Sequence, residues 1–150
     1  MAVLLVVHHS PGPSLGAMCA QILAGAAAPG LEEVEIRSIP ALEAPAAAVR
    51  EADGIILGTP ANLGYMSGAL KHFFDTSYNE CLGTTSALPY CVFVHGESDT
   101  TGALHAIEKI ATGLEWRLAQ PPVSAIGQPD QAMLDRCWEL GAAMAAGLTV

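Results

Sequence analysis

Short runs of apolar residues alternate with segments of helical periodicity, and this alternation limits the fold more than any other feature of the chain. Ala2 to His8 is a continuous run of mainly valine and leucine, as expected for a strand covered on both faces. Apolar residues then recur at the three- and four-residue spacing of one helix face, until Pro29 and Gly30 stop the helix. The periodic residues are Leu15, Met18, Cys19, Ile22, Leu23 and Ala26. The chain therefore begins with a strand followed by a helix.

This strand-and-helix pair is expected five times along the sequence. The later strands are predicted at residues 33–38, 54–58, 89–95 and 122–126, and helical segments follow them at 45–52, 66–74, 104–114 and 133–144. Residues 33–38 alternate polar and apolar side chains, which is typical of a strand at or near a sheet edge. Because crossovers between parallel strands are right-handed, such a chain forms a parallel sheet with helices on both faces.

Five strands without a sixth favour one of the two common strand orders of such α/β sheets. The expected fold is a flavodoxin-like three-layer sandwich with a five-stranded parallel sheet in the order 2-1-3-4-5, rather than the six-stranded dinucleotide-binding fold. We expect residues 1–150 to form a single domain of this kind. Its ligand should bind outside the carboxyl ends of the strands, on the loops after the first, third and fourth strands.

Composition and charge exclude several classes of protein. Hydrophobic residues make up 51% of the chain and charged residues 14%, which excludes a disordered protein. The net charge of −9 disfavours nucleic acid and anionic lipid as partners. The four cysteines lack CxxC spacing, and no histidine pair has metal-ligand spacing with carboxylate support, so no metal is expected. The first apolar run is too short for a signal peptide or a membrane span, so a cytoplasmic protein is expected.

The most informative loop follows the strand predicted at residues 54–58. Thr59-Pro60 forces an extended exit from the strand, Gly64 permits a positive φ, and Ser67-Gly68 begins a helix. Residues 58–75 resemble the motif G-T/S-P-x-x-x-G-x-M-S/A-G-x-L-K-x-F-x-D of flavodoxin-like NAD(P)H:FMN and quinone oxidoreductases, including the WrbA-type enzymes. The match is close over about residues 53–76 and looser in the first loop. A plain strand, turn and helix explains the hydrophobic period but not the joint occurrence of these residues.

The loop after the first strand combines two hydroxyl groups, a glycine and a helix start. Backbone N–H groups and the helix dipole can hold a phosphate there without lysine or arginine, although a plain turn with Ser14 as helix N-cap explains the loop about equally well. Neither a GxGxxG fingerprint nor a P-loop is present. The family resemblance implies FMN, with its phosphate on Ser10, Gly12, Ser14 and Leu15. It implies that the isoalloxazine ring lies beside the second loop, at Thr59, Pro60, Ala61, Asn62, Leu63 and Gly64.

The third loop, residues 95–102, matches the family only by position. His95 and Gly96 are expected at the cofactor, because the family places a glycine-rich turn here with its amides toward the flavin. Glu97 and Asp99 are compatible with an acid/base pair or with a solvated turn. No aromatic residue in this loop could stack on the ring, which weakens the interpretation as a one-electron carrier. Tyr65 is the nearest aromatic residue, and it fits a flavin contact or an exposed helix start.

The charges near the carboxyl ends of the strands are acidic. They are Glu43, Glu97, Asp99 and Asp130, and no lysine or arginine joins them unless Arg37 reaches over. If FMN binds, these carboxylates should disfavour its anionic reduced state and lower its potential. NADPH should bind weakly, because its 2′-phosphate normally requires arginine. NADH or a protein donor would then be preferred.

Three functions fit these observations. The first is an FMN-dependent oxidoreductase that passes electrons from NADH or NADPH to a quinone, a flavin or a similar small acceptor, without a named catalytic side chain. The second is a flavodoxin-type electron carrier, and the third is a binding protein of the same fold without flavin. The final helix is compatible with burial in a homodimer or against the chain's own sheet, through Ala142, Ala143, Ala145 and Ala146.

Overall fold

The computed structural model describes residues 1–149, so Val150, the last residue of the expected domain, lies outside the described residues. The five expected segments each contain a strand. These strands are β1 (Ala2–His8), β2 (Val34–Pro40), β3 (Gly54–Asn62), β5 (Pro89–Gly96) and β7 (Val123–Ile126). Two further strands of two residues each are additional, namely β4 (Tyr65–Met66) and β6 (Arg117–Leu118).

Five α-helices and one 3-10 helix connect the strands in the described part of the chain. They are α1 (Pro13–Ala26), the 3-10 helix η1 (Ala41–Glu43), α2 (Ala46–Glu51), α3 (Gly68–Cys81), α4 (Thr101–Gly113) and α5 (Gln131–Ala146). Ser67 caps α3 by accepting the Leu70 N–H at 3.2 Å, and Asp130 caps α5 by accepting the Met133 N–H at 2.8 Å. Among residues 1–149, no helix combines the length and the apolar character needed to span a bilayer.

The sheet has the expected flavodoxin-like α/β character, but it is not exactly the expected five-stranded sheet in the order 2-1-3-4-5. The five predicted strands follow that order as β2-β1-β3-β5-β7, and the short strands β4 and β6 are additional. Seven strands of residues 1–149 form the sheet, and its main path is β2-β1-β3-β5-β6. The strands on this path are parallel, and β7 is also parallel to β5. β4 is antiparallel to β3 and closes a short hairpin with it. The far edge is therefore shared by two short strands, where one continuous strand was expected.

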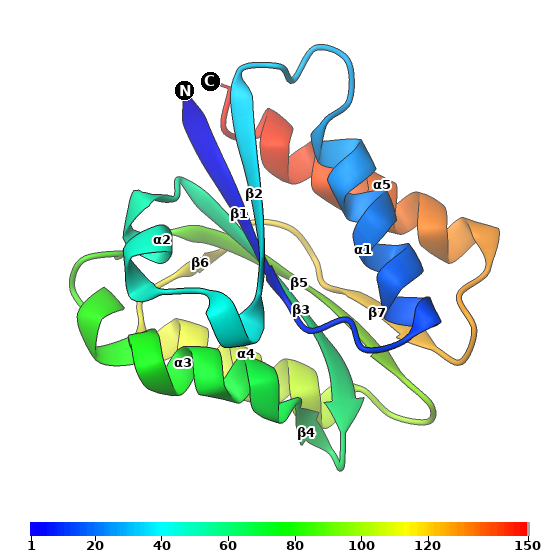
Figure 1. The fold of residues 1–150 in the computed structure, drawn as a ribbon. Coiled ribbons are helices and arrows are strands. Elements are labelled where there is room, and N and C mark those ends of the chain that lie inside the picture. The colour runs from blue at the N-terminus through cyan, green and yellow to red at the C-terminus, as the bar shows by residue number, and fades with distance from the viewer. Residues whose placement is uncertain (150) are drawn as a thin grey trace.

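The helices cover both faces of the sheet, with α1 and α5 on one face and α2, α3 and α4 on the other (Figure 1). Side chains of the central strands alternate between two hydrophobic cores, one under each helix layer. Leu5 and Val7 of β1 face the layer formed by α2, α3 and α4, where Phe73 and Phe74 are buried. Leu4 and Val6 face the layer formed by α1 and α5. Burial on both faces explains why the sequence shows continuous apolar runs at β1, β3 and β5.

Helices α1 and α5 approach each other closely because glycines lie at their contact. A Cβ on Gly25 would lie 1.9 Å from the Trp138 carbonyl oxygen, and a Cβ on Gly141 would lie 2.0 Å from the Ile22 carbonyl oxygen. Ala145 is fully buried within the chain. The face of α5 that carries Gly141 and Ala145 therefore packs within the protein, whereas Ala146 is exposed, and burial of this helix in a homodimer stays a prediction.

Candidate functional site

The three loops singled out by the sequence lie at one edge of the sheet. His8 at the end of β1 pairs with Gly58 of β3 and with Pro40 of β2, while Pro60 of β3 pairs with His95 of β5. The loops that follow these residues therefore leave the sheet side by side, at the carboxyl ends of the parallel strands. This is the edge at which open α/β sheets bind their ligands.

Two cavities lie at this edge, and both border the first loop. The Ser14–Glu97 cavity has a volume of about 530 Å³ and is lined by Pro13, Ser14, Ala17, Glu97, Gln128, Pro129 and Leu134. The His8–Glu43 cavity has a volume of about 420 Å³ and is lined by His8, His9, Ser10, Pro11, Pro40, Ala41, Leu42, Glu43 and Ala69. Of the twelve residues expected at the cofactor, Ser10 and Ser14 line a cavity directly.

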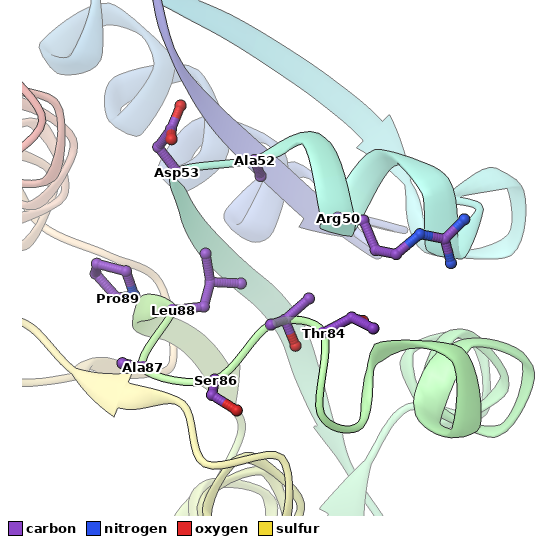
Figure 2. A pocket seen from close by; sticks show the side chains of 9 residues that line it. Arg50, Ala52, Asp53, Thr84, Ser86, Ala87, Leu88 and Pro89 are labelled. Atoms are coloured by element: carbon purple, nitrogen blue, oxygen red, sulfur yellow. The ribbon is translucent and has the colours of Figure 1, made fainter.

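A third pocket, of about 250 Å³, lies at the opposite edge, where β3 and β5 begin (Figure 2). Its charged side chains already have protein partners. The Asp53 carboxylate accepts the Val3 N–H at 2.8 Å, and Arg50 forms an ion pair with Glu80 at 3.0 Å. None of the residues expected at the cofactor lines this pocket. It is therefore separate from the candidate site.

The first loop offers backbone donors at the start of α1. Gly12 is the N-cap of this helix, and no side chain caps it. The expected alternative of Ser14 as N-cap is wrong, because Ser14 is the second residue of the helix. The first hydrogen bond of the helix runs from the Gly16 N–H to the Gly12 carbonyl at 2.9 Å, which leaves the N–H groups of Ser14 and Leu15 directed out of the helix end. Such groups, together with the helix dipole, favour an anion.

Gly12 leaves open space at this helix start. Its φ of −137° and ψ of 176° are ordinary extended values that any residue adopts. A Cβ at this position would meet no protein atom within 4 Å. Neither backbone strain nor packing within the protein therefore requires glycine here. The open space and the adjacent N–H donors fit the phosphate of a nucleotide such as FMN.

In the second loop, Thr59 stabilises the chain's own turn. Its side chain is fully buried, donates to the Pro60 carbonyl at 2.8 Å and accepts the Ser67 N–H at 2.9 Å. Pro60 is buried as well, whereas Asn62, Leu63 and Gly64 are exposed. Thr59 thus fixes the path of the exposed turn, and its hydroxyl group is already used for that purpose.

Leu63 and Gly64 form the tip of the β3–β4 hairpin. Both have positive φ angles, of 52° and 76°, as the tight turn between two antiparallel strands requires. Glycine adopts this conformation freely, whereas leucine does so at a cost of about 1–3 kcal/mol. The Leu63 side chain is fully exposed, and Tyr65 in β4 is 41% exposed. The turn thus presents an apolar side chain beside the residues expected at the flavin ring.

The third loop is held by contacts within the protein. His95 Nε2 lies 2.7 Å from the Gly127 carbonyl oxygen, which ties the end of β5 to the loop after β7. Gly96 is buried, and a Cβ there would lie 3.2 Å from the Ala61 Cβ. The Asp99 carboxylate accepts the Thr101 N–H at 3.0 Å, and hydrogen bonds to Thr101 lower its pKa. Asp99 therefore stabilises the start of α4, while Glu97 lines a cavity.

Sequence patterns do not reveal how closely α4 approaches the hairpin tip. A Cβ on Gly102 would lie 1.9 Å from the Gly64 carbonyl oxygen, so glycine is needed at this position. The sequence gives little indication that glycine is required at this position, because Gly102 follows two threonines in a segment without any recognisable motif. Sequence reasoning also missed the contact of His8 with Ser38, whose Oγ lies 3.1 Å from His8 Nε2. The pairing of β1 with β2 produces that contact, and no local pattern encodes it.

In the described part of the chain, no lysine or arginine lines either cavity at the carboxyl edge. Arg37 pairs with Glu35 and with Glu51, so it does not reach over as the sequence allowed. All four cysteines are buried free thiols, and no group of three or more metal-ligating side chains occurs in the described residues. The candidate site therefore offers amides, hydroxyl groups, imidazoles and carboxylates.

Comparisons with known proteins found one family model and several solved structures that resemble this chain. A family model described as NADPH-dependent FMN reductase matches residues 5–129. A flavodoxin from the domain Archaea is similar over 99% of both chains, with a TM-score of 0.83 and 19% identity. A WrbA-like flavodoxin protein from Agrobacterium tumefaciens is similar over 99% of this chain and 98% of that chain, with a TM-score of 0.77 and 21% identity.

A third structure, the two-electron reduced flavodoxin of Megasphaera elsdenii, has a TM-score of 0.79 and 20% identity, over 95% of this chain and 98% of that chain. At these identities the structures establish a shared fold. No curated protein sequence matches the chain significantly.

Proposed function

Because the chain belongs to the NADPH-dependent FMN reductase family, we propose that residues 1–150 form one FMN-binding domain that passes electrons from a nicotinamide cofactor to a quinone, a flavin or a similar small acceptor. The family supports both FMN and a nicotinamide donor. The observation that carries the proposal is the first loop, where uncapped N–H groups of α1 lie beside the open space at Gly12. An anionic phosphate matches both features.

In this proposal the chain binds and orients the cofactor with neutral groups. The N–H groups of Ser14 and Leu15 and the hydroxyl group of Ser10 hold the phosphate. Ala61, Asn62 and Leu63 lie along the ring, and Gly64, His95 and Gly96 complete the two loops that border it. Thr59 and Pro60 keep the exposed turn in place from within the protein. Bound FMN supplies hydride acceptance and electron transfer, so no side chain needs to act as an acid or a base.

Reconstitution with FMN tests this function directly. Purified protein incubated with excess FMN and desalted should retain the yellow absorbance of the flavin. Under nitrogen, NADH or NADPH should bleach it within seconds, and a water-soluble benzoquinone should restore the colour. An electron carrier would retain FMN but bleach negligibly with either nicotinamide. Protein that stays colourless after incubation would contradict both flavin functions and favour a binding protein of the same fold.

We expect NADH to be the better donor. The family description names NADPH, but neither carboxyl-edge cavity is lined by the arginine that a 2′-phosphate normally requires. One missing charged hydrogen bond corresponds to about tenfold in affinity, so the KM for NADPH should exceed that for NADH by about that factor. Steady-state kinetics with both donors measures this ratio. A low-micromolar KM for NADPH would contradict the expectation.

Glu97 should lower the reduction potential of bound FMN, because its carboxylate opposes added negative charge. Glu97→Gln is expected to raise the two-electron midpoint potential by roughly 10–20 mV, as an exposed charge interacts only weakly with the ring. Glu33→Gln removes the same charge at the opposite edge of the sheet and should leave the potential unchanged. Photoreduction against a reference dye measures both variants. A wild-type potential well above that of free FMN would contradict the underlying argument.

A further inference from the structure

Within residues 1–149, His8 at the end of β1 and the adjacent His9 are the only basic side chains that line either carboxyl-edge cavity. The six lysines and arginines of the sequence do not occur among the lining residues of these cavities. Dianionic ligands are usually bound by cationic or charge-assisted donors. An anion at this edge therefore has His8 and His9 as its candidate ring donors.

His9 has an unused ring nitrogen. Its backbone is fixed, because the His9 N–H donates to the Gly58 carbonyl at 3.0 Å. Its Nδ1 is shielded from solvent and has no hydrogen-bond partner within residues 1–149. A polar atom in this state is unfavourable until a ligand or water satisfies it. His9 also lines the His8–Glu43 cavity, and its shielded Nδ1 reaches a ligand there only when the ring turns toward the cavity.

His8 connects the first loop to the edge strand. Its Nδ1 lies 3.1 Å from Ser10 Oγ and its Nε2 lies 3.1 Å from Ser38 Oγ. Burial and the neighbouring His9 lower the pKa of His8, so its ring is neutral near pH 7 and has one donor and one acceptor nitrogen. If Ser38 donates to Nε2, then Nδ1–H donates to Ser10 and leaves the Ser10 proton free. The ring therefore determines whether Ser10 can donate to an anion.

Resting on the proposed function, we propose that the His9 ring turns toward the cavity and donates from Nδ1 to the phosphate of bound FMN. We also propose that His8 is a positioning residue that keeps the Ser10 proton directed at the same phosphate. The imidazole pair then takes the place of the missing lysine or arginine. Glu43 lines the same cavity from η1, and its carboxylate opposes the anion.

The affinity for FMN relative to riboflavin, which lacks the phosphate, isolates this contribution. Quenching of flavin fluorescence gives both dissociation constants for each variant. Wild-type protein should bind FMN more tightly than riboflavin, and His9→Leu should reduce that preference about tenfold to a hundredfold. The riboflavin affinity should change less than about twofold. His9→Gln keeps a side-chain N–H donor and should recover part of the preference. His105→Leu, at an exposed position on α4, is the matched control.

The positioning role of His8 is tested by a double-mutant cycle. His8→Leu and Ser10→Ala should each lower the preference for FMN by about threefold to tenfold. Because His8 acts through Ser10, His8→Leu should add nothing further in the Ser10→Ala background. Additive effects would overturn the positioning role.

Three results would overturn the role of His9. His9→Leu could weaken FMN and riboflavin equally, which is the behaviour of a purely structural residue, or it could leave the preference unchanged. Wild-type protein could also bind FMN and riboflavin with equal affinity. That result would overturn the contact of His9 with the phosphate but not the proposed flavin-dependent function. Failure of wild-type protein to bind either ligand overturns the proposed function itself, and that result is visible before any variant is made. Circular dichroism of each variant identifies a loss of fold.

Discussion

Gly12→Val should lower the affinity for FMN by about a hundredfold or more, while the free energy of unfolding of the flavin-free protein changes by less than about 1 kcal/mol. Gly12 has ordinary extended backbone angles and open space around its missing Cβ, so the protein itself accommodates valine. The new side chain would occupy the space beside the Ser14 and Leu15 N–H groups that the phosphate needs. Flavin fluorescence quenching and urea unfolding measure the two quantities.

The control is Gly147→Val, at the end of α5, where a Cβ would make only ordinary contacts. It should change neither FMN affinity nor the fold. Unchanged FMN binding by Gly12→Val would place the phosphate elsewhere and remove the main support for the proposed site. A large loss of stability in the flavin-free variant would show instead that Gly12 is needed by the protein itself.

Gly25→Ala should destabilise the protein by about 2–3 kcal/mol, although it removes a glycine from a helix. Its Cβ would lie 1.9 Å from the Trp138 carbonyl oxygen, and backbone on both sides leaves no flexible group to yield. The helices α1 and α5 must therefore move apart, which loosens the core that contains Met18, Ile22 and Met144. For a chain of this size the melting temperature should fall by roughly 5–10 °C.

Gly16→Ala is the matched control in the same helix. A Cβ at Gly16 meets nothing within 4 Å, so alanine should stabilise the helix by about 0.5–1 kcal/mol. Both substitutions replace glycine with alanine in the same helix, but they should change the free energy of unfolding in opposite directions. Gly141→Ala should lower the free energy of unfolding by about as much as Gly25→Ala does. The double variant should lose less stability than the two single losses added together, because both substitutions separate α1 from α5. Equal melting temperatures for Gly16→Ala and Gly25→Ala would contradict the close contact.

The main strands and helices could be predicted because burial determines them. β1, β3 and β5 are covered on both faces, which produces continuous apolar runs, and α1 shows its buried face as a regular period. β4 and β6 could not be predicted, because two residues are too few for an alternating pattern. They exist because Tyr65–Met66 folds back on β3 and Arg117–Leu118 pairs with the start of β5. The far edge of the sheet, which β6 and β7 share, likewise arises from pairing with β5 in the folded protein and not from a local sequence pattern.

At the candidate site, the sequence located the loops but not the partners of their side chains. Spacing alone put the first and second loops at one edge, since parallel strands end together. It could not show that the Thr59 hydroxyl group is consumed within its own turn, or that Asp99 and Asp130 stabilise helix starts. Those contacts depend on side-chain directions that arise only when strands and helices are packed. The role of each of the twelve expected cofactor residues stays a prediction.

The contact between Gly102 and the Gly64 carbonyl has a consequence for dynamics. Two backbones that approach this closely cannot move independently, so the tip of the β3–β4 hairpin and the first turn of α4 should move together. α4 lines neither cavity at the carboxyl edge, yet its first amides should report events at the tip. Hydrogen–deuterium exchange at residues 101–104 should therefore slow when a ligand immobilises the tip, so exchange in the first turn of α4 reports whether the site is occupied.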